Sequence, residues 1–478
     1  MAAHGSPATA DELLSSPWDV VVIGGGNAAL ASAMSAHDQG ARVLVLERSD
    51  VTFRGGNSRH TRNIRCVHNS ADAYNTGAHT FDELWKDLCS VGSGPSDEEL
   101  ADLTVRESES VTGWMAERGA LFQPPLAGTL HLGRTNRFFL GGGKALLNNY
   151  YRTLRKRQIP VVYEATVEEL VFDGDRCTEL VVNHAGRRHS LRAAAVVAAA
   201  GGFEGNVEWL AKYWGDAARN FHIRGPRHND GLILRALLDS GARTAGEERG
   251  FHAVAVDARS PKFDGGIATR LDCIPFGVVL NNRQERFYDE GQDIWPKRYA
   301  IWGRNISQQP DQIAYCFWDS KAQGQFLPPM YGVFSAPTIE GVASQMGMDP
   351  ARSAATIEQY NAGVPEDAAA RFNPAHLDAL ATTSVTPPKT NWAQRLDSPP
   401  YYGIAMRPGI TFTYMGVGVD RQARVQREDG SRFANVFAAG EIMSGNILSS
   451  GYLAGFGMTI GTVWGRIAGK EAAQNALR

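Results

Sequence analysis

Short, fully apolar runs recur along the chain, and several of them lead directly into glycine. They lie at residues 20–23, 193–200 and 436–439, and a related run at 42–46 ends at an acid. Strands that are buried on both faces of a parallel sheet have this unbroken apolar character. The pattern therefore predicts an α/β fold built around a parallel sheet.

In much of the chain between these runs, apolar residues recur at the spacing of a helix face. Within residues 70–118, the side chains of Phe81, Leu84, Trp85 and Leu88 fall on one apolar face of a helix. Further helices are expected from residue 143 and from about 457 to the C-terminus, and further strands at 161–163, 167–172 and 179–182.

The middle of the chain changes character, with irregular apolar spacing and many tryptophans and prolines. We interpret it as an inserted α+β domain. The predicted organisation is a flexible leader at 1–17, a Rossmann-like dinucleotide-binding domain in two parts at 18–249 and 396–478, and the insert at 250–395. The dinucleotide-binding domain is therefore discontinuous.

Composition restricts the class of protein. A chain of 478 residues is too long for a single hydrophobic core, so we expect two or more domains. Its net charge of −3 gives no reason to expect nucleic acid as a partner. The five cysteines never form C-x-x-C, so we expect no metal or iron–sulfur site and a reducing cytoplasmic location. Neither a signal peptide nor an apolar run of about 18 residues is present, so we expect attachment to a membrane, if it occurs, through a partner.

The strongest motif follows the first strand. Gly24, Gly26 and Ala29 form a G-x-G-x-x-A turn that opens a helix of small residues. In such a turn the glycines let a pyrophosphate approach the backbone, and the third small residue lets the helix lie close to the sheet. Glu47 ends the next strand, where a carboxylate accepts a ribose hydroxyl. NAD and FAD both fit this fingerprint.

Two later features favour FAD. Strand-plus-glycine units recur at 198–202 and 438–441, as expected when one extended cofactor crosses several strand ends. The segment SSGYLAGFGMTIG places glycines at the start of the final helix. Free N–H groups and the helix dipole at that point can hold a flavin carbonyl oxygen.

The chain resembles the fumarate reductase/succinate dehydrogenase flavoprotein superfamily over nearly its full length. The resemblance rests on IGGGNAALASA, RGGNS, AAAGGFEGN, VVLNNRQERFYDE and VFAAGE. Within it, RGGNSRHTRNIR, FLGGGKALLNNYY and the final glycine-rich helix look most like the FAD-dependent tricarballylate dehydrogenase branch. The resemblance implies an FAD-binding domain, a capping insert, and redox chemistry at a carbon–carbon bond beside a carboxylate.

The resemblance also implies which residues bind FAD. Ser58 stands near the position of the histidine that carries covalent FAD in some relatives, so we expect non-covalent FAD, although His60 lies close by. The residues carried over as cofactor contacts are Gly24, Gly26, Asn27, Ala28, Ala29, Glu47, Arg48, Gly55, Gly56, Asn57, Ser58, Val167, Gly201, Gly440, Glu441, Gly455, Gly457 and Met458.

Three substrate residues of the fumarate reductases are replaced here. Ile294 and Tyr452 stand where those enzymes have arginines, and Phe412 stands near their late histidine, whereas His252 is retained. We therefore do not expect fumarate reduction. Tyr452, before a glycine-rich turn, is also similar to the tyrosine of the ketosteroid dehydrogenases.

A basic segment follows the expected flavin loop. It contains Arg59, His60, Arg62 and Arg65, and a polyanionic substrate needs such cations. The expected catalytic or substrate-binding residues are Tyr452, Arg62, His252 and Arg298, the last beside Lys297. A solvated loop, structural ion pairs and ordinary core packing are the competing interpretations of these side chains, and no residue is assigned as the base.

The leading hypothesis is an FAD-dependent dehydrogenase that desaturates a polycarboxylic acid, tricarballylate to cis-aconitate. Its electrons would pass to a separate iron–sulfur or haem protein at the membrane. The alternatives are a ketosteroid-type or biosynthetic desaturase, which predicts an apolar pocket, and a flavin electron-transfer subunit without a substrate site.

Overall fold

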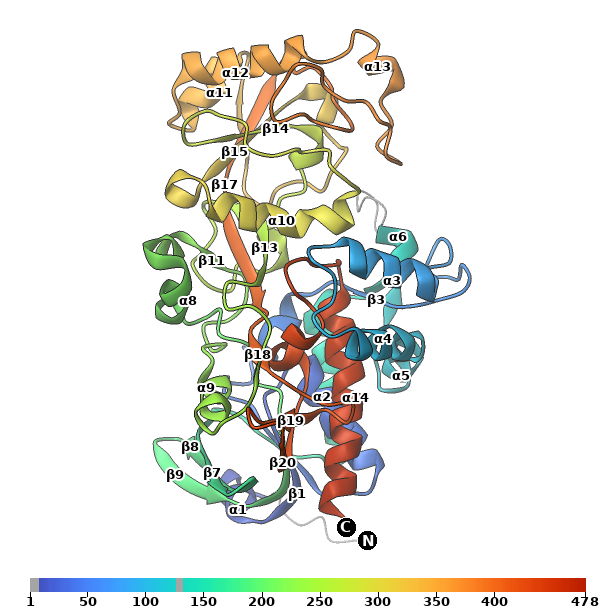
Figure 1. The fold of residues 1–478 in the computed structure, drawn as a ribbon, viewed down its shortest axis with the longest axis vertical. Helices are drawn as coiled ribbons and strands as arrows, with labels where there is room; N and C mark the ends of the chain where they lie inside the picture. The colour runs from blue at the N-terminus through green and yellow to red at the C-terminus, as the bar shows by residue number, and fades with distance from the viewer. Residues whose placement is uncertain (1–7, 126–131) are drawn as a thin grey trace.

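The computed structural model describes residues 8–125 and 132–478. It is elongated, with a lower part built on one parallel sheet and an upper part built on a second sheet (Figure 1). The first sheet has the order β19 (Arg424–Gln426), β20 (Arg432–Ala438), β10 (Ala193–Ala198), β1 (Trp18–Ile23), β2 (Val43–Leu46) and β6 (Val161–Val162). All its neighbours are parallel except β19 and β20. The apolar runs are its central strands, which confirms the expected α/β class.

Helix α14 (Phe456–Ala476) packs along α2 (Asn27–Asp38), and glycine on α14 makes this close approach feasible. A Cβ atom at Gly465 would lie 2.6 Å from the carbonyl oxygen of Ala28, and one at Gly469 would lie 2.1 Å from that of Ser32. The two helices therefore touch backbone to backbone. This contact brings the start of the final helix against the first glycine-rich turn.

The second sheet carries the insert. Its long strand β17 (Tyr401–Thr413) pairs with β11 (His222–Ile223), β13 (Phe251–Asp257), β15 (Ala314–Asp319) and β16 (Phe334–Ala336), and β15 pairs with β14 (Val278–Asn281). Helices α10 (Trp295–Ser307), α11 (Ile339–Gln345) and α12 (Pro350–Ala362) lie in this upper part (Figure 1). The sheet thus extends beyond the predicted insert of 250–395 on both sides.

Smaller elements flank the two sheets. Helices α3 (Phe81–Ser90), α4 (Glu98–Glu107) and α5 (Val111–Glu117) occupy the segment expected to be helical. Helix α7 (Gly142–Lys156) follows a small sheet of β3 (Asn63–Arg65), β5 (Asn136–Phe139) and β4 (Phe122–Gln123). Another three-stranded sheet contains β7 (Ala165–Asp173), β8 (Arg176–His184) and β9 (Arg187–Leu191).

The predicted flexible leader is partly ordered. Residues 10–15 form helix α1 (Ala10–Ser15), which starts with a capping box between Thr9 and Glu12 and buries Leu14. The sequence prediction missed this helix because a single buried leucine in six residues gives no periodic signal. Residues 1–7 of the leader lie outside the described part of the chain.

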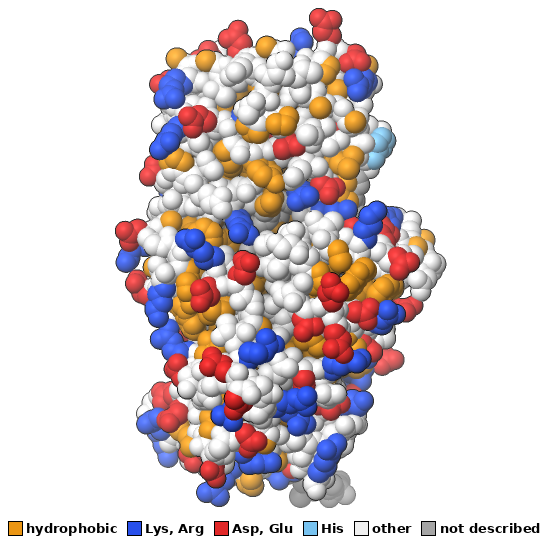
Figure 2. Space-filling model, in the orientation of Figure 1, with side chains coloured by type: hydrophobic (Ala, Val, Ile, Leu, Met, Phe, Trp, Pro, Cys, Tyr) orange, Lys and Arg blue, Asp and Glu red, His pale blue; other side chains and the backbone are white. Residues whose placement is uncertain are grey.

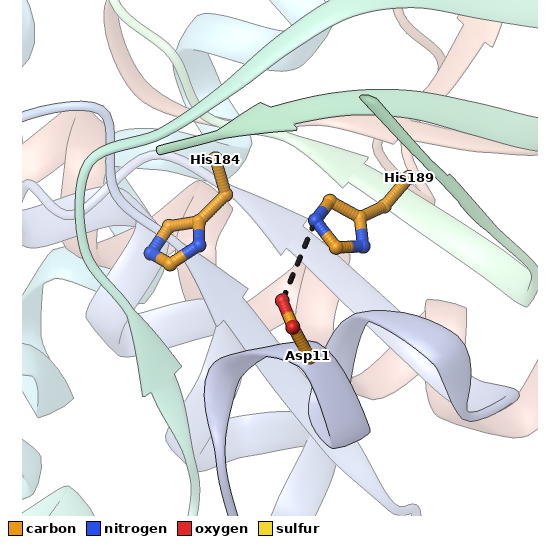
Figure 3. Close-up of side chains that lie close together, drawn as sticks. All are labelled: Asp11, His184 and His189. Atoms are coloured by element: carbon orange, nitrogen blue, oxygen red, sulfur yellow. Dashed lines mark ion pairs between the residues drawn. The ribbon is translucent and has the colours of Figure 1, made fainter. Parts of the chain in front are cut away.

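Polar and charged side chains join helix α1 to the hairpin of β8 and β9. Asp11 faces His184 and His189 (Figure 3). Its Oδ1 atom lies 3.6 Å from Nε2 of His189, and its Oδ2 atom lies 2.8 Å from Nη1 of Arg187. Because the Arg187 guanidinium already pairs with the Asp11 carboxylate, we interpret these side chains as an ion-pair network and not as a metal site.

Acidic and basic side chains are interspersed over the face shown in Figure 2. No helix in the described ranges combines the length and the apolar character needed to cross a bilayer.

Candidate functional site

A large cavity opens at the carboxyl ends of β1, β2, β10 and β20 and is covered by residues of the insert. Its volume, mouth included, is about 1670 Å³. In open α/β sheets, ligands bind at this end of the strands.

Most of the predicted cofactor residues line this one cavity. Ala29 and Gly55 do not: Ala29 is buried within α2, and the N–H of Gly55 donates to Oε2 of Glu47 at 3.0 Å. The predicted residues that line the cavity are Gly24, Gly26, Asn27, Ala28, Glu47, Arg48, Gly56, Asn57, Ser58, Val167, Gly201, Gly440, Glu441, Gly455, Gly457 and Met458.

The glycine-rich turn is built for close approach of a ligand. Gly24 has φ +119°, and a Cβ atom there would lie 2.3 Å from the carbonyl oxygen of Ala199. Gly26 caps α2 without any side chain over the first turn of the helix, and the N–H of Asn27 donates to Oγ of Ser58 at 3.0 Å. Backbone N–H groups at such a helix start suit an anion such as a pyrophosphate.

Glu47, at the end of β2, is fixed by backbone hydrogen bonds beside the glycine-rich turn. Its oxygens accept hydrogen bonds from the N–H groups of Ser49 at 2.9 Å and Gly55 at 3.0 Å. Burial is the largest influence and raises the pKa of Glu47, against the lowering effect of these hydrogen bonds. Next to it, Arg48 pairs with Asp230 at 2.7 Å. The carboxylate therefore has a fixed orientation beside the cavity.

The start of α14 also lines the cavity, next to the start of α2. Gly455, in the left-handed region with φ +81°, caps the helix. The hydroxyl oxygen of Tyr452 accepts a hydrogen bond from the N–H of Gly457 at 3.0 Å. Asn27 donates to Oγ1 of Thr462 at 2.9 Å, which ties the starts of α2 and α14 together. The two glycine-rich helix starts therefore face the same cavity.

Three arginines line the part of the cavity nearest the insert: Arg62, Arg224 and Arg270. Arg270 pairs with Asp272 at 2.6 Å, and Arg224 donates from Nη1 to Oγ1 of Thr411 at 2.7 Å. Arg62 forms no ion pair with any described residue, and its buried Nε and Nη2 atoms have no partner there. Burial, followed by the charge of Arg270, lowers the pKa of Arg62. Arg62 is therefore a half-buried cation that has no direct ion pair within the described residues, although the charge of Asp272 acts on it.

Sequence reasoning identified Arg62 but missed Arg224 and Arg270. Both lie within irregular segments that carry no motif: Arg224 in RGPRHND and Arg270 in ATRLDC. An arginine within such segments gives no signal of its own, and only the tertiary fold brings the three guanidinium groups together.

Aromatic side chains form the wall beside the arginines. Nε2 of His252 lies 3.2 Å from the hydroxyl oxygen of Tyr299, and the ring centroids of His252 and Tyr452 are 3.8 Å apart. The ring of Phe412 lies 5.4 Å from that of Tyr452. His252 and Tyr452, two of the predicted site residues, thus line the cavity together with Tyr299, which the sequence analysis did not name.

These aromatic groups are held neutral. Burial lowers the pKa of His252 well below its usual value, with Arg224 and Arg270 acting in the same direction. Burial raises the pKa of Tyr452, and it raises that of Tyr299 to about 12. A tyrosine can serve as a base only if its pKa is lowered. Tyr452 is therefore placed as a hydrogen-bond donor.

The other predicted cations do not face the cavity freely. Nη2 of Arg65 pairs with Asp87 at 2.5 Å, and Nζ of Lys297 pairs with the same carboxylate at 2.8 Å. Nη2 of Arg298 lies 3.9 Å from Asp293, and Arg298 is not among the cavity-lining residues. His60 lines the cavity, but its Nε2 atom is hydrogen-bonded to Asp264 and burial lowers its pKa; Arg59 donates to the carbonyl oxygen of Phe53.

We expect Asp87→Ala to destabilise the fold strongly. Asp87, on α3, is 6 % exposed and joins Arg65 to Lys297 of the insert helix α10. Its removal leaves two cations without their counter-ion, which costs about 3–5 kcal/mol. Urea unfolding followed by tryptophan fluorescence measures the loss.

The matched control is Asp102→Ala, since Asp102 pairs with Arg106 at 2.7 Å on an exposed helix face. An exposed pair contributes about 0–1 kcal/mol. Equal losses in the two variants would contradict the structural role of Asp87.

Comparisons with known proteins match this geometry. A family model described as "FAD binding domain" matches residues 19–455. The NADH:fumarate oxidoreductase of Klebsiella pneumoniae is 25 % identical over 474 residues, which cover 96 % of this chain and 48 % of the relative. The chain thus spans about half the length of that relative.

Two solved structures share the fold. An open conformation of a flavocytochrome c3 fumarate reductase aligns with a TM-score of 0.73 at 21 % identity, covering 97 % of this chain and 79 % of that one. A 3-ketosteroid-Δ4-(5α)-dehydrogenase from Rhodococcus jostii aligns with a TM-score of 0.71 at 22 % identity, covering 96 % and 97 %.

The family model covers far more than half of the chain, and the cavity has the two glycine-rich helix starts and the ordered acid that an extended dinucleotide needs. The chain therefore belongs to the FAD-binding domain family, and its cofactor is FAD.

Proposed function

We propose that the chain is an FAD-dependent dehydrogenase that desaturates a polycarboxylic acid, with conversion of tricarballylate to cis-aconitate as the specific reaction. The observation that carries the proposal is the group of three arginines in the cavity, of which only Arg270 has a carboxylate partner among the described residues. Such a site costs free energy when empty, since buried cations need counter-ions. Substrate carboxylates supply them.

The roles of the side chains follow from this arrangement. Arg62 pairs with one substrate carboxylate, and Arg224 and Arg270 hold further carboxylate groups. Their charge stabilises the enolate-like anion that develops when the proton beside the carboxylate leaves, an effect commonly worth several kcal/mol. Bound FAD supplies the acceptor for the hydride from the adjacent carbon. Tyr452 and Tyr299 donate hydrogen bonds from neutral hydroxyls.

Further features of the proposal concern the cofactor and the electron acceptor. Ser58 in the cofactor loop cannot carry the covalent histidine link, and Nε2 of His60 is bound to Asp264 at 2.9 Å, which supports non-covalent FAD. The five cysteines are scattered as free thiols. A separate iron–sulfur or haem partner at the membrane is therefore proposed as the electron acceptor, with the chain itself in the cytoplasm.

A ketosteroid-type desaturase is the second candidate, favoured by the aromatic wall of His252, Phe412 and Tyr452. It requires an apolar pocket, whereas the three arginines make this one cationic. The third candidate is an electron-transfer subunit with no substrate of its own.

One experiment separates the candidates. The purified flavoprotein is mixed anaerobically with tricarballylate, succinate, a monocarboxylate or a 3-ketosteroid, and the bleaching of oxidised flavin is followed. We expect tricarballylate or a similar polycarboxylate to bleach the flavin. Bleaching by the ketosteroid alone, or by none of the four, would reject the proposal.

A further inference from the structure

Two glutamates meet at the floor of the cofactor cavity. Glu441 follows strand β20 and lines the cavity. Glu204 lies in the loop after β10 and is completely buried. The two side chains come from sequence positions far apart, and the fold places their carboxyl groups side by side.

Their hydrogen bonds distinguish the four oxygens. Oε1 of Glu204 accepts from Nδ2 of Asn57 at 2.6 Å and from Nδ2 of Asn229 at 2.8 Å. Oε1 of Glu441 accepts from the N–H of Thr413 at 3.1 Å, and its Oε2 accepts from Nδ2 of Asn57 at 3.0 Å. Three of the four oxygens thus lie within hydrogen-bond distance of an N–H donor, and the two hydrogens of Asn57 Nδ2 are divided among Glu204, Glu441 and the carbonyl oxygen of Thr411. Oε2 of Glu204 is buried and has none among the described residues.

No cation compensates the pair. Neither glutamate forms an ion pair with a described lysine, arginine or histidine. The nearest guanidinium connection is indirect: Arg224 binds Oγ1 of Thr411, whose carbonyl oxygen accepts from Asn57. Tyr452 lines the same cavity as Glu441 and stays neutral, because burial raises its pKa.

Two adjacent carboxylates cannot both stay ionised at such a site. Burial raises the pKa of Glu204, and burial together with the neighbouring Glu204 raises that of Glu441. Carboxyl pairs of this kind retain one shared proton. Oε2 of Glu204 is the carboxyl oxygen of the pair that has no N–H donor among the described residues, so it is available for the hydrogen bond that holds the shared proton.

We propose that Glu204 and Glu441 share a single proton, which is held between Oε2 of Glu204 and the carboxyl group of Glu441. Glu204 is then a positioning residue. It orients the Glu441 carboxylate toward the cofactor cavity and limits the pair to one negative charge. This limit favours binding of FAD, because the cofactor diphosphate is itself anionic. The inference rests on FAD as the cofactor and is independent of the substrate.

Infrared difference spectroscopy of the FAD-loaded protein at neutral pH tests the protonation state. Subtracting the spectrum of Glu204→Gln from that of the wild type should show loss of a protonated carboxyl C=O band. Loss of carboxylate bands instead would mean that both glutamates are ionised in the wild type and would overturn the proposal. Glu164→Gln, at an exposed position, is the matched control and should show carboxylate loss.

FAD affinity of the apoprotein gives a second readout that a purely structural role would not produce. Glutamine at position 204 can still donate a hydrogen bond to Glu441, whereas leucine cannot. We expect the FAD dissociation constant of Glu204→Gln to stay within about threefold of wild type, and that of Glu204→Leu to rise about tenfold or more, the cost of unsatisfied buried polar groups. Equal weakening in both variants would contradict a donor role for Glu204.

Discussion

Arg62→Met is expected to lower kcat/KM for the carboxylate substrate by about 10²–10³-fold, the usual loss when one donor to a developing anion is removed. Arg62 lies half-buried at the cavity wall, and its Nε and Nη2 atoms have no partner among the described residues. Its charge is therefore available to the substrate. Arg270 is already compensated by Asp272. Anaerobic stopped-flow reduction of the flavin measures the effect.

The variant should remain yellow, because Arg62 has no hydrogen bond that holds the glycine-rich turn. The absorbance ratio of flavin to protein checks this point. Arg106→Met, on an exposed helix face, is the matched control for removal of a guanidinium. If Arg62→Met reduced its flavin at the wild-type rate, the polycarboxylate site would have to lie elsewhere.

Local signals explain why so much of the cofactor side was predictable. An apolar run followed by glycine is a property of neighbouring residues, and β1, β10 and β20 all carry it. Gly24 takes a positive φ because strand and helix must reverse within two residues. These constraints are encoded in contiguous sequence, so the cofactor cavity could be outlined before the fold was known.

The substrate side is different because its residues owe their positions to tertiary packing. Arg65 and Lys297 have the spacing of substrate-binding cations, yet Asp87 pairs with both. Nothing in the spacing of a basic residue reveals which carboxylate lies opposite it. Conversely, Arg270 gives no sequence signal and becomes significant only because α10 and the loop before β14 converge on the cavity.

The domain boundary illustrates a related limit. The sequence change near residue 395 marks the end of the irregular segment, but β17 continues to pair with the insert up to Thr413. A strand has the same apolar alternation whichever sheet it joins, so composition cannot assign it to one of two sheets. The division at 395 and 396 stays a prediction about domains.

Gly24→Ala is expected to give a protein that folds but purifies almost without flavin. The backbone at Gly24 has φ +119°, and the new Cβ atom would lie 2.3 Å from the carbonyl oxygen of Ala199 on the neighbouring strand end. Both are backbone constraints, so the turn must move. We expect the FAD dissociation constant to rise about 100-fold, which corresponds to about 2.8 kcal/mol. Flavin fluorescence quenching on titration of the apoprotein measures it.

Gly40→Ala separates this collision from the cost of backbone strain alone. Gly40 also has a positive φ, +89°, but a Cβ atom there meets nothing within 4 Å. Its replacement costs about 1–2 kcal/mol of stability as a left-handed residue and leaves the cofactor cavity untouched. We therefore expect Gly40→Ala to be yellow with wild-type FAD affinity. A Gly24→Ala protein that bound FAD equally well would show that the turn after β1 is not where the cofactor diphosphate lies.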